Sequence, residues 1–461
     1  MIARLSTAGI ATCLLSLAVG HAQPSPELPY QTVAKELTAA GLRSCGAYKL
    51  LGELSGGIGP RLSGSPNAAR AVEWGKQTME RLGFDDVHLE PVLVPHWVRG
   101  DVENAAILPT NGGEIPIAMC ALGGSIGTPA EGVVAEVVEV KSFGELHSLG
   151  DKVRGKMVFF NRPMDPTKFT TFEAYGGAVD QRGDGSMESA RMGGVAALVR
   201  SMTTRLDNVP HTGAMYYVDS IPKVPGAAIS TVAANVLDSL LSVDPHLKVR
   251  LRLSCATLPD VESANVVGEL RGSEKPGDVI VIGGHLDSWD KGRGAHDDGT
   301  GIVQSLEALR LLKGAGLMPK RTIRAVLFMN EENGSRGGKG YAAKDRPGEH
   351  PMLAIESDAG GFSPRGFGLS ADSVTFGHVA RWSYLLDPIG AGKITKGGDG
   401  TDISPLGRKG VPTMGLFVDS QRYFDYHHSD SDTIDKVNER EVELGAISMA
   451  IISYVLAQEG M

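Results

Sequence analysis

The stretch that most constrains the fold runs from Asp278 to Gly301 and reads DVIVIGGHLDSWDKGRGAHDDGTG. Its apolar run, Val279 to Ile282, is too short for a buried helix and rich in β-branched residues, which indicates a central strand of a parallel sheet. His285 and Asp287 stand just past the carboxyl end of that strand, at the edge where open α/β sheets bind ligands. A second polar cluster, at 296–298, precedes an amphipathic helix. The stretch therefore predicts an α/β fold with a polar site at one edge of its sheet.

Strand-like and helical patterns alternate through the C-terminal half of the chain. Buried strands are expected at 322–330, 352–357 and 411–418, and a last helix is expected to follow Asn438, a residue type that caps helices. This alternation favours a mostly parallel, mixed sheet with helices on both faces.

The region between 98 and 255 has a different texture, with short strand-like runs separated by glycines and polar turns. One of these runs, 247–254, alternates strictly between apolar and polar residues, as a strand with one solvated face does. A chain of 461 residues is also too long for one ordinary domain. We therefore expect a first part of an α/β domain at 23–97, an inserted β-rich domain at 98–255 and the main α/β domain at 256–461.

The first 22 residues have the pattern of a secretory signal peptide. Arg4 precedes an apolar stretch, and the small residues Gly20 and Ala22 precede a cleavage position before Gln23. We therefore expect a secreted or periplasmic protein. No later run reads as long and apolar enough to cross a bilayer, so no membrane anchor is expected. A net charge of −9 without a basic block argues against nucleic acid as a partner.

Three cysteines remain after the signal segment: Cys45, Cys120 and Cys255. Their spacing matches no zinc ribbon and no redox pair. One disulfide with one free thiol, or three buried thiols, are both compatible with the sequence.

Acidic residues and histidines gather where the expected strands end. Chance would scatter such residues over the surface, so this common edge indicates a site. Imidazole and carboxylate ligands without cysteine suit zinc in a hydrolytic centre, with cobalt or manganese as alternatives. The residues concerned are His285, Asp297, Glu331, Glu332, Asp358, His427 and His428.

Five segments together resemble the metal-site motifs of the di-zinc aminopeptidases and glutamate carboxypeptidases, and the first two segments and the inserted region most closely resemble the carboxypeptidase Q branch. In chain order they read GGHLDSWD, GAHDDGTG, NEENG, ESDAGG and HHSDSDT. Each segment alone is a weak signal, but all five in order are highly specific. The resemblance implies a zinc-aminopeptidase-like α/β fold, and it identifies the inserted region as similar to a protease-associated domain.

The resemblance also implies a role for each residue at a site with two Zn²⁺ per chain. His285 and Asp358 would hold one zinc, Glu332 and His428 the other, and Asp297 would bridge both. Glu331 is implied as the general base for the attacking water. Asp287 is the second catalytic candidate, because it would orient the ring of His285. His428 is preferred to His427 because the family's ligand stands four residues before the aspartate of its Asp-Thr pair.

The substrate is less constrained than the metal site. Thr401 and Ser404, in the loop GGDGTDISPL, and His427 are candidate substrate contacts, although simple turn formation explains that loop equally well. The carboxypeptidase Q branch implies dipeptides with both termini free, and the wider family implies aminopeptidase action on longer peptides. Hydrolysis of N-acyl amino acids and a non-catalytic binding protein are the remaining alternatives. Family members often form homodimers, although no feature of this sequence establishes one.

Overall fold

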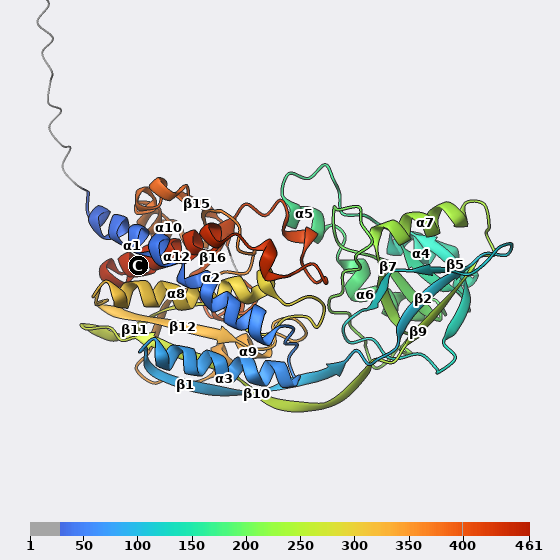
Figure 1. Ribbon diagram of the computed structural model, residues 1–461, viewed down its shortest axis with the longest axis horizontal. Coiled ribbons are helices and arrows are strands. Elements are labelled where there is room, and N and C mark those ends of the chain that lie inside the picture. The colour runs from blue at the N-terminus through green and yellow to red at the C-terminus, as the bar shows by residue number, and fades with distance from the viewer. Residues whose placement is uncertain (1–27, 399) are drawn as a thin grey trace, which may run out of the picture.

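The computed structural model describes residues 28–398 and 400–461. These residues form two eight-stranded sheets, one in each of two lobes (Figure 1). The first lobe comprises residues 28–98 and 256–461, and the second lobe comprises residues 103–253. The expected signal segment, 1–22, lies outside the described residues.

The sheet of the first lobe is mixed, as its sequence predicts. The neighbouring strands β12, β11, β13 and β16 are parallel to one another, whereas β1, β10 and β14 each run antiparallel to a neighbour. In order across the sheet, the strands are β1 (Asp85–Val98), β10 (Ala256–Leu270), β12 (Arg321–Phe328), β11 (Lys275–His285), β13 (His350–Glu356), β16 (Thr413–Val418), β14 (Pro364–Ser370) and β15 (Lys393–Lys396).

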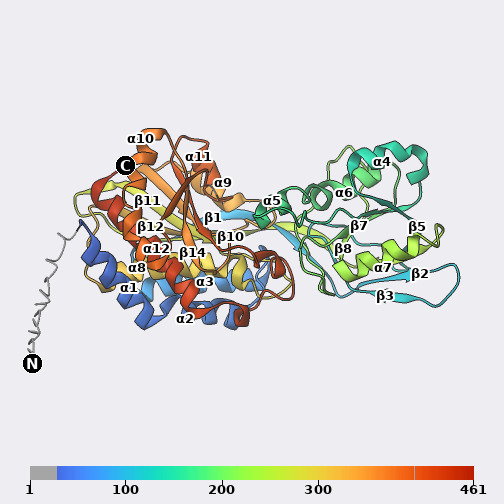
Figure 2. The same ribbon diagram turned by 90° about the horizontal axis from the view of Figure 1, so that it is seen from above.

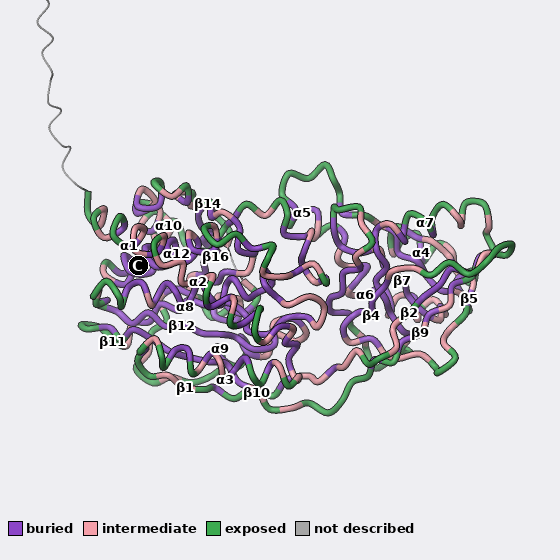
Figure 3. The backbone as a smooth tube through the Cα atoms, in the orientation of Figure 1, coloured by how far each residue is buried: buried purple, intermediate pink, exposed green. Residues whose placement is uncertain are grey.

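Helices cover both faces of this sheet because its central strands are apolar on both sides. Ile280 and Ile282 of β11 pack under one helical layer, while Val279 and Val281 pack under the other. Figure 3 shows that buried residues predominate in α8 and β12. One layer contains α1 (Gln31–Ser44), α2 (Gly46–Leu51), α3 (Pro66–Arg81), α8 (Thr300–Gly314) and α12 (Glu439–Glu459), and the other contains α9 (Arg336–Ala343) and α11 (Ser404–Gly407).

The last helix, α12, confirms one expectation from the sequence and corrects another. Asn438 does cap it, since the Asn438 side chain accepts hydrogen bonds from the backbone of Arg440 and Glu441. By length and composition, however, α12 could cross a bilayer, contrary to our reading that no later run could do so. In this fold 83% of its apolar window is buried, and it packs against α8 and α1 as a core helix.

The second lobe contains the short strands expected there, together with more helix than the sequence suggested. In order, its strands are β3 (Ile115–Ile117), β2 (Glu103–Leu108), β9 (Lys248–Leu253), β5 (Val133–Val140), β6 (Met157–Phe160), β7 (Ala196–Arg200), β8 (Gly226–Ile229) and β4 (Met119–Ala121). Its helices are α4 (Phe143–Leu149), α5 (Thr171–Gly176), α6 (Asp180–Arg191) and α7 (Thr231–Leu241). All of these elements lie within the range 98–255 that the sequence analysis assigned to an inserted domain.

The two lobes are joined by the long antiparallel pair β1 and β10. The pair runs from Asp85 opposite Glu269 to Val98 opposite Ala256, with register shifts after Asp85 and after Val94, so the chain enters and leaves the second lobe side by side. Figure 2 shows α5 and α6 of the second lobe facing the first lobe. The three described cysteines, Cys45, Cys120 and Cys255, are all free thiols in this structure.

Candidate metal centre

The ends of the parallel strands bring the predicted ligands together. His285 is the last residue of β11, and Asp297 lies in the turn Ala295–Gly299 that leads into α8. Glu332 follows β12, and Asp358 follows β13. Carboxyl ends of parallel strands share one edge, so residues from distant parts of the chain converge there.

The carboxylate of Asp297 lies between two groups of side chains. Its Oδ1 is 3.2 Å from Nε2 of His285, and that nitrogen is also 3.5 Å from Oδ1 of Asp358. Its Oδ2 is 3.2 Å from Nε2 of His428, which is 3.1 Å from Oε2 of Glu332. One oxygen of Asp297 therefore faces each group.

His427 and His428 stack on each other, with ring centroids 3.5 Å apart. Both rings approach Asp297, but Nε2 of His427 is 3.7 Å from Oδ2 of Asp297, against 3.2 Å for His428. The contact with Glu332 belongs to His428. The distances therefore favour His428 as the ligand, and His427 remains beside it in the lining of the cleft.

The buried donor atoms fit a metal ion. Oδ2 of Asp297 and Oδ1 of Asp358 are buried without a hydrogen-bond partner among the described residues, although each lies near an imidazole nitrogen. The ligand atoms of His285, Asp297 and Asp358 all lie within 4.8 Å of one another. Nitrogen and carboxylate donors in this number suit Zn²⁺, and a cation would satisfy the bare oxygens.

Opposing charges shift the protonation of this cluster. Burial disfavours a charged imidazole, but the carboxylates of Asp358 and Asp297 outweigh it and hold the pKa of His285 well above its usual value. His428 behaves in the same way, since Glu332 and Asp297 raise its pKa to about 9 against burial. Burial and the neighbouring Asp297 raise the pKa of Glu332 to about 8. The group thus carries excess carboxylate charge in a buried place, as a cation site does.

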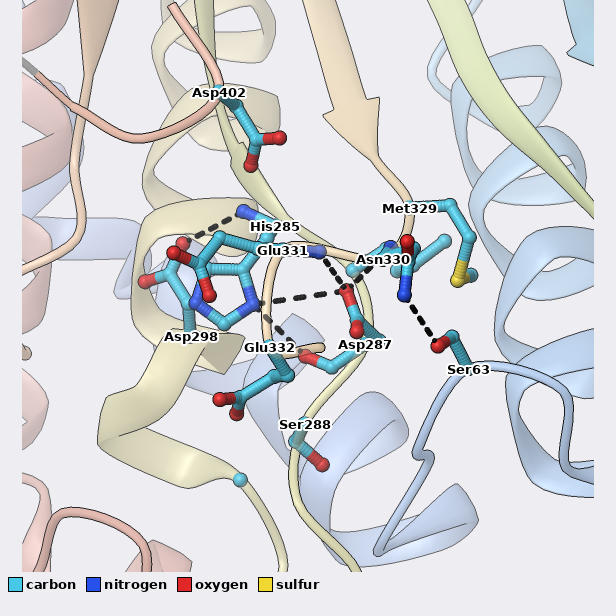
Figure 4. Close-up of polar contacts among 12 residues, drawn as sticks. Ser63, His285, Asp287, Ser288, Asp298, Met329, Asn330, Glu331, Glu332 and Asp402 are labelled. Carbon is cyan, nitrogen blue, oxygen red and sulfur yellow. Dashed lines mark hydrogen bonds and ion pairs between the residues drawn. The ribbon is translucent and has the colours of Figure 1, made fainter. Parts of the chain in front are cut away.

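Further aspartates hold the predicted ligands in position through hydrogen bonds to the ligand rings or to the backbone, as Figure 4 shows for Asp287. Oδ1 of Asp287 accepts the backbone N–H of Asn330 at 2.8 Å and of Glu331 at 3.1 Å. The backbone oxygen of Asp287 lies 3.1 Å from Nδ1 of His285, which leaves Nε2 of that ring for the centre. Asp287 therefore orients His285 and also fixes the turn that carries Glu331.

Two aspartates inside the quoted motifs act similarly, although neither was among the predicted site residues. Oδ2 of Asp298 accepts the backbone N–H of His285 at 3.0 Å. Asp432 accepts the backbone N–H groups of His296 at 2.7 Å and of Asp297 at 3.1 Å. A hydrogen bond to the backbone of a ligand restricts where its side chain points.

Glu331 lines the cleft beside the ligand group. Burial raises the pKa of its carboxyl, and the nearby Asp358 adds to the effect. Thr401, a predicted substrate contact, lines the same cleft, and its proximity lowers the pKa of Glu331 against these two effects. Ser404, the other predicted contact in this loop, is not among the residues that line the cleft. Its hydroxyl instead donates to the Thr401 carbonyl at 3.1 Å and accepts from Arg408 at 3.0 Å.

The cleft above the ligands has a volume of about 440 Å³ and is walled by both lobes. The second lobe contributes several side chains that the sequence analysis missed, because no local motif marks them. They are Phe172, Tyr175, Arg182, Ala214 and Tyr216.

Arg182 is the charged member of this wall. It is only 8% exposed, its Nε has no hydrogen-bond partner, and no carboxylate lies within 4 Å of it in the part of the chain that the structure describes. Its guanidinium lies 5.5 Å from the centroid of the Tyr175 ring, and its Nη1 lies 3.4 Å from Nδ1 of His428. The same nitrogen of His428 lies 3.3 Å from the Thr212 carbonyl, so the second lobe also orients this ligand.

The chain is similar to characterised peptidases over most of its length. Peptidase family M28 matches residues 265–454. Carboxypeptidase Q of Bos taurus is 39% identical over 432 residues, which are 93% of this chain and 89% of that protein. Carboxypeptidase Q of Homo sapiens is 38% identical over 412 residues, which are 89% of this chain and 85% of that protein.

Solved structures show the same likeness. The crystal structure of a peptidase M28 precursor from Shewanella amazonensis SB2B superposes with a TM-score of 0.89 at 33% identity, covering 94% of this chain and 97% of that one. BSAP, a zinc aminopeptidase from Bacillus subtilis, superposes with a TM-score of 0.66 at 18% identity, covering 90% of this chain and 96% of that one. The second likeness concerns the fold alone.

Proposed function

The chain belongs to peptidase family M28 and is a zinc metallopeptidase of the exopeptidase type, and we propose that it hydrolyses dipeptides or short peptides at a centre of two zinc ions. His285 and Asp358 would hold one ion, Glu332 and His428 the other, and Asp297 both. The observation that carries the proposal is the carboxylate of Asp297, whose two oxygens face the two ligand groups separately.

A zinc pair, when bound, supplies Lewis-acid polarisation of a carbonyl and activation of a water molecule. The chain itself provides the proton transfer, because Glu331 lies at the cleft beside the ligands with a raised carboxyl pKa. Its carboxylate takes the proton of the attacking water and returns it to the leaving amine. Asp287 positions both His285 and the Glu331 turn through its hydrogen bonds.

The shape and charge of the cleft support a small substrate with a free carboxyl terminus. A volume of about 440 Å³ is at the lower end of the range for small-molecule sites. Arg182 presents a buried cation without a carboxylate partner at the wall of this cleft. A guanidinium is suited to bidentate recognition of a carboxylate, and the α-carboxylate of a dipeptide has that geometry. Aromatic rings of Phe172 and Tyr216 flank the same wall and suit apolar substrate side chains.

We further propose that the protein is exported by its N-terminal segment and that the second lobe is a protease-associated domain that completes the cleft. Two contacts support an active part for that lobe. The backbone N–H of Thr212 donates to the His428 carbonyl at 2.9 Å, and His211 forms an isolated bridge to Ser429. The loop that carries His428 is thus fastened to the second lobe.

A substrate panel with metal analysis tests the proposal. The purified protein is given free dipeptides, aminoacyl-naphthylamides, longer peptides and N-acyl amino acids, and amine release is followed with and without a chelator. We expect about two zinc ions per chain and chelator-sensitive hydrolysis that is fastest on dipeptides. Preference for naphthylamides and longer peptides would instead identify an aminopeptidase, and preference for N-acyl amino acids an amidohydrolase. One zinc per chain in the fully active enzyme would refute the bridging role of Asp297.

A further inference from the structure

The turn-rich segment from Gly56 to Pro66 contains a buried arginine that the proposed function does not use. Arg61 is completely buried. No carboxylate lies within 4 Å of its guanidinium among the described residues, and its side-chain hydrogen bonds all go to backbone carbonyls. Burial of a charge is costly, so a buried guanidinium that bonds only carbonyls needs a reason other than an ion pair.

Three of the four carbonyls that Arg61 bonds lie at the two ends of one loop, and the fourth is that of Gly59, at 3.4 Å from Nη1. Its Nε donates to the Leu286 carbonyl at 2.6 Å. Its Nη1 donates to the Arg293 carbonyl and its Nη2 to the Gly294 carbonyl, both at 2.9 Å. Leu286 directly follows His285, and Gly294 stands three residues before Asp297. The planar guanidinium therefore joins the point where the chain leaves one ligand to the point where it approaches the next.

The loop is shaped to receive this side chain. Gly294 has a φ of +56°, and a Cβ at this position would stand 2.7 Å from Nη1 of Arg61 and 2.3 Å from Cβ of Ser288. The hydroxyl of Ser55 donates to the same Gly294 carbonyl at 2.9 Å, and Arg293 donates back to the Ser55 carbonyl at 2.7 Å. Only glycine combines that backbone conformation with so close an approach.

We propose that Arg61 is a positioning residue of the metal centre: it clamps both ends of the loop Leu286–Gly294 and thereby holds His285 and Asp297 at the separation that zinc requires. This inference rests on the proposed function, because it takes His285 and Asp297 as ligands. A fixed fork of donors suits the task, since a lysine in its place offers a single ammonium that cannot reach two loop ends in one plane.

The test compares Arg61→Lys with Arg321→Lys in the full-length protein. Arg321 serves as the control, because it is also a buried arginine that donates to backbone carbonyls, those of Ala457 and Gln458 at 3.1 Å, although its Nε also lies 3.3 Å from Oδ2 of Asp278. Arg321 begins β12, at the end of the sheet opposite the ligands. Zinc affinity is measured by competition with a chromogenic chelator, and the absorption spectrum of the cobalt-substituted protein reports the ligand geometry.

We expect Arg61→Lys to fold, to bind zinc about 10- to 100-fold more weakly and to alter the cobalt spectrum, as loss of a contact behind a ligand does. Arg321→Lys should lower the melting temperature while leaving zinc affinity and the spectrum unchanged. Gly294→Ala, which displaces the loop end from the guanidinium, should repeat the effect of Arg61→Lys.

Three results would overturn the inference. Wild-type zinc affinity in folded Arg61→Lys is the first, and an equal loss of affinity in Arg321→Lys is the second. The third is failure of both Arg61→Lys and Gly294→Ala to fold, since Arg61 would then serve the whole fold. Zinc binding is measured independently of peptide hydrolysis. If the protein does not hydrolyse dipeptides, the effect of Arg61→Lys on zinc affinity can therefore still be interpreted.

Discussion

Replacement of Arg182 by Gln gives the sharpest test of substrate choice. The guanidinium is 8% exposed, has an unpartnered Nε and lines the cleft, so a substrate carboxylate would form its missing ion pair. Charge-assisted hydrogen bonds in such surroundings contribute about 1.5–3 kcal/mol. At about 1.4 kcal/mol for each factor of ten, Arg182→Gln should lower kcat/KM on free dipeptides by roughly 10- to 150-fold.

The assay measures kcat/KM on a free dipeptide and on the same dipeptide with an amidated carboxyl terminus. The amide lacks the negative charge, so Arg182→Gln should change its hydrolysis little, and the preference for the free acid should fall. Arg182→Lys should lie between, because it keeps the charge and loses the planar fork. Lys339 also lines the cleft, but from the first lobe, and Lys339→Gln should leave the ratio of the two substrates unchanged. An equal loss on both substrates, with zinc content preserved, would refute the carboxylate role of Arg182.

Further predictions concern proton transfer by Glu331, the hydrogen bonds of Asp432 to the backbone around Asp297, and the buried pair Glu307 and Glu443. Glu331→Gln should keep its zinc and lower kcat by about 10²- to 10⁴-fold, and near-wild-type turnover would show that another group is the base. Asp432→Asn leaves one acceptor for the two N–H groups of His296 and Asp297, so urea unfolding should show a loss of about 1–3 kcal/mol; an unchanged midpoint would contradict this role. Burial and the neighbouring Glu307 raise the pKa of Glu443 to about 8. Between about pH 5 and pH 8 the folded protein therefore keeps a proton on Glu443 that the unfolded chain has already lost. The free energy of unfolding should consequently fall as the pH rises through this range. Glu443→Gln should remove this pH dependence of the free energy of unfolding and should be more stable than the wild type at pH 8 by ~1–3 kcal/mol in thermal unfolding. Parallel pH profiles of the two proteins would refute this role of Glu443.

The ligand candidates could be found from sequence because each one follows a short local pattern. The run Val279–Ile282 indicates a strand, and the residue type just beyond a strand end is visible without tertiary information. Family likeness then supplied the choice between His427 and His428, which local pattern alone could not make. For Ser404 the local pattern could not decide, because a polar residue in a turn looks the same whether it faces substrate or bonds a carbonyl of its own turn, as the Ser404 hydroxyl does with Thr401.

The sequence by itself determined the class of sheet, the family and the chemical kinds of ligand, since these depend on residue types within segments of ten or twenty residues. Only the tertiary structure decided that Arg182 from the second lobe reaches the cleft, and that Arg61 joins the ends of the loop after His285. The physical reason is that these contacts link residues more than a hundred positions apart. They depend on how the lobes and layers pack against each other, and no periodicity or local spacing records that packing.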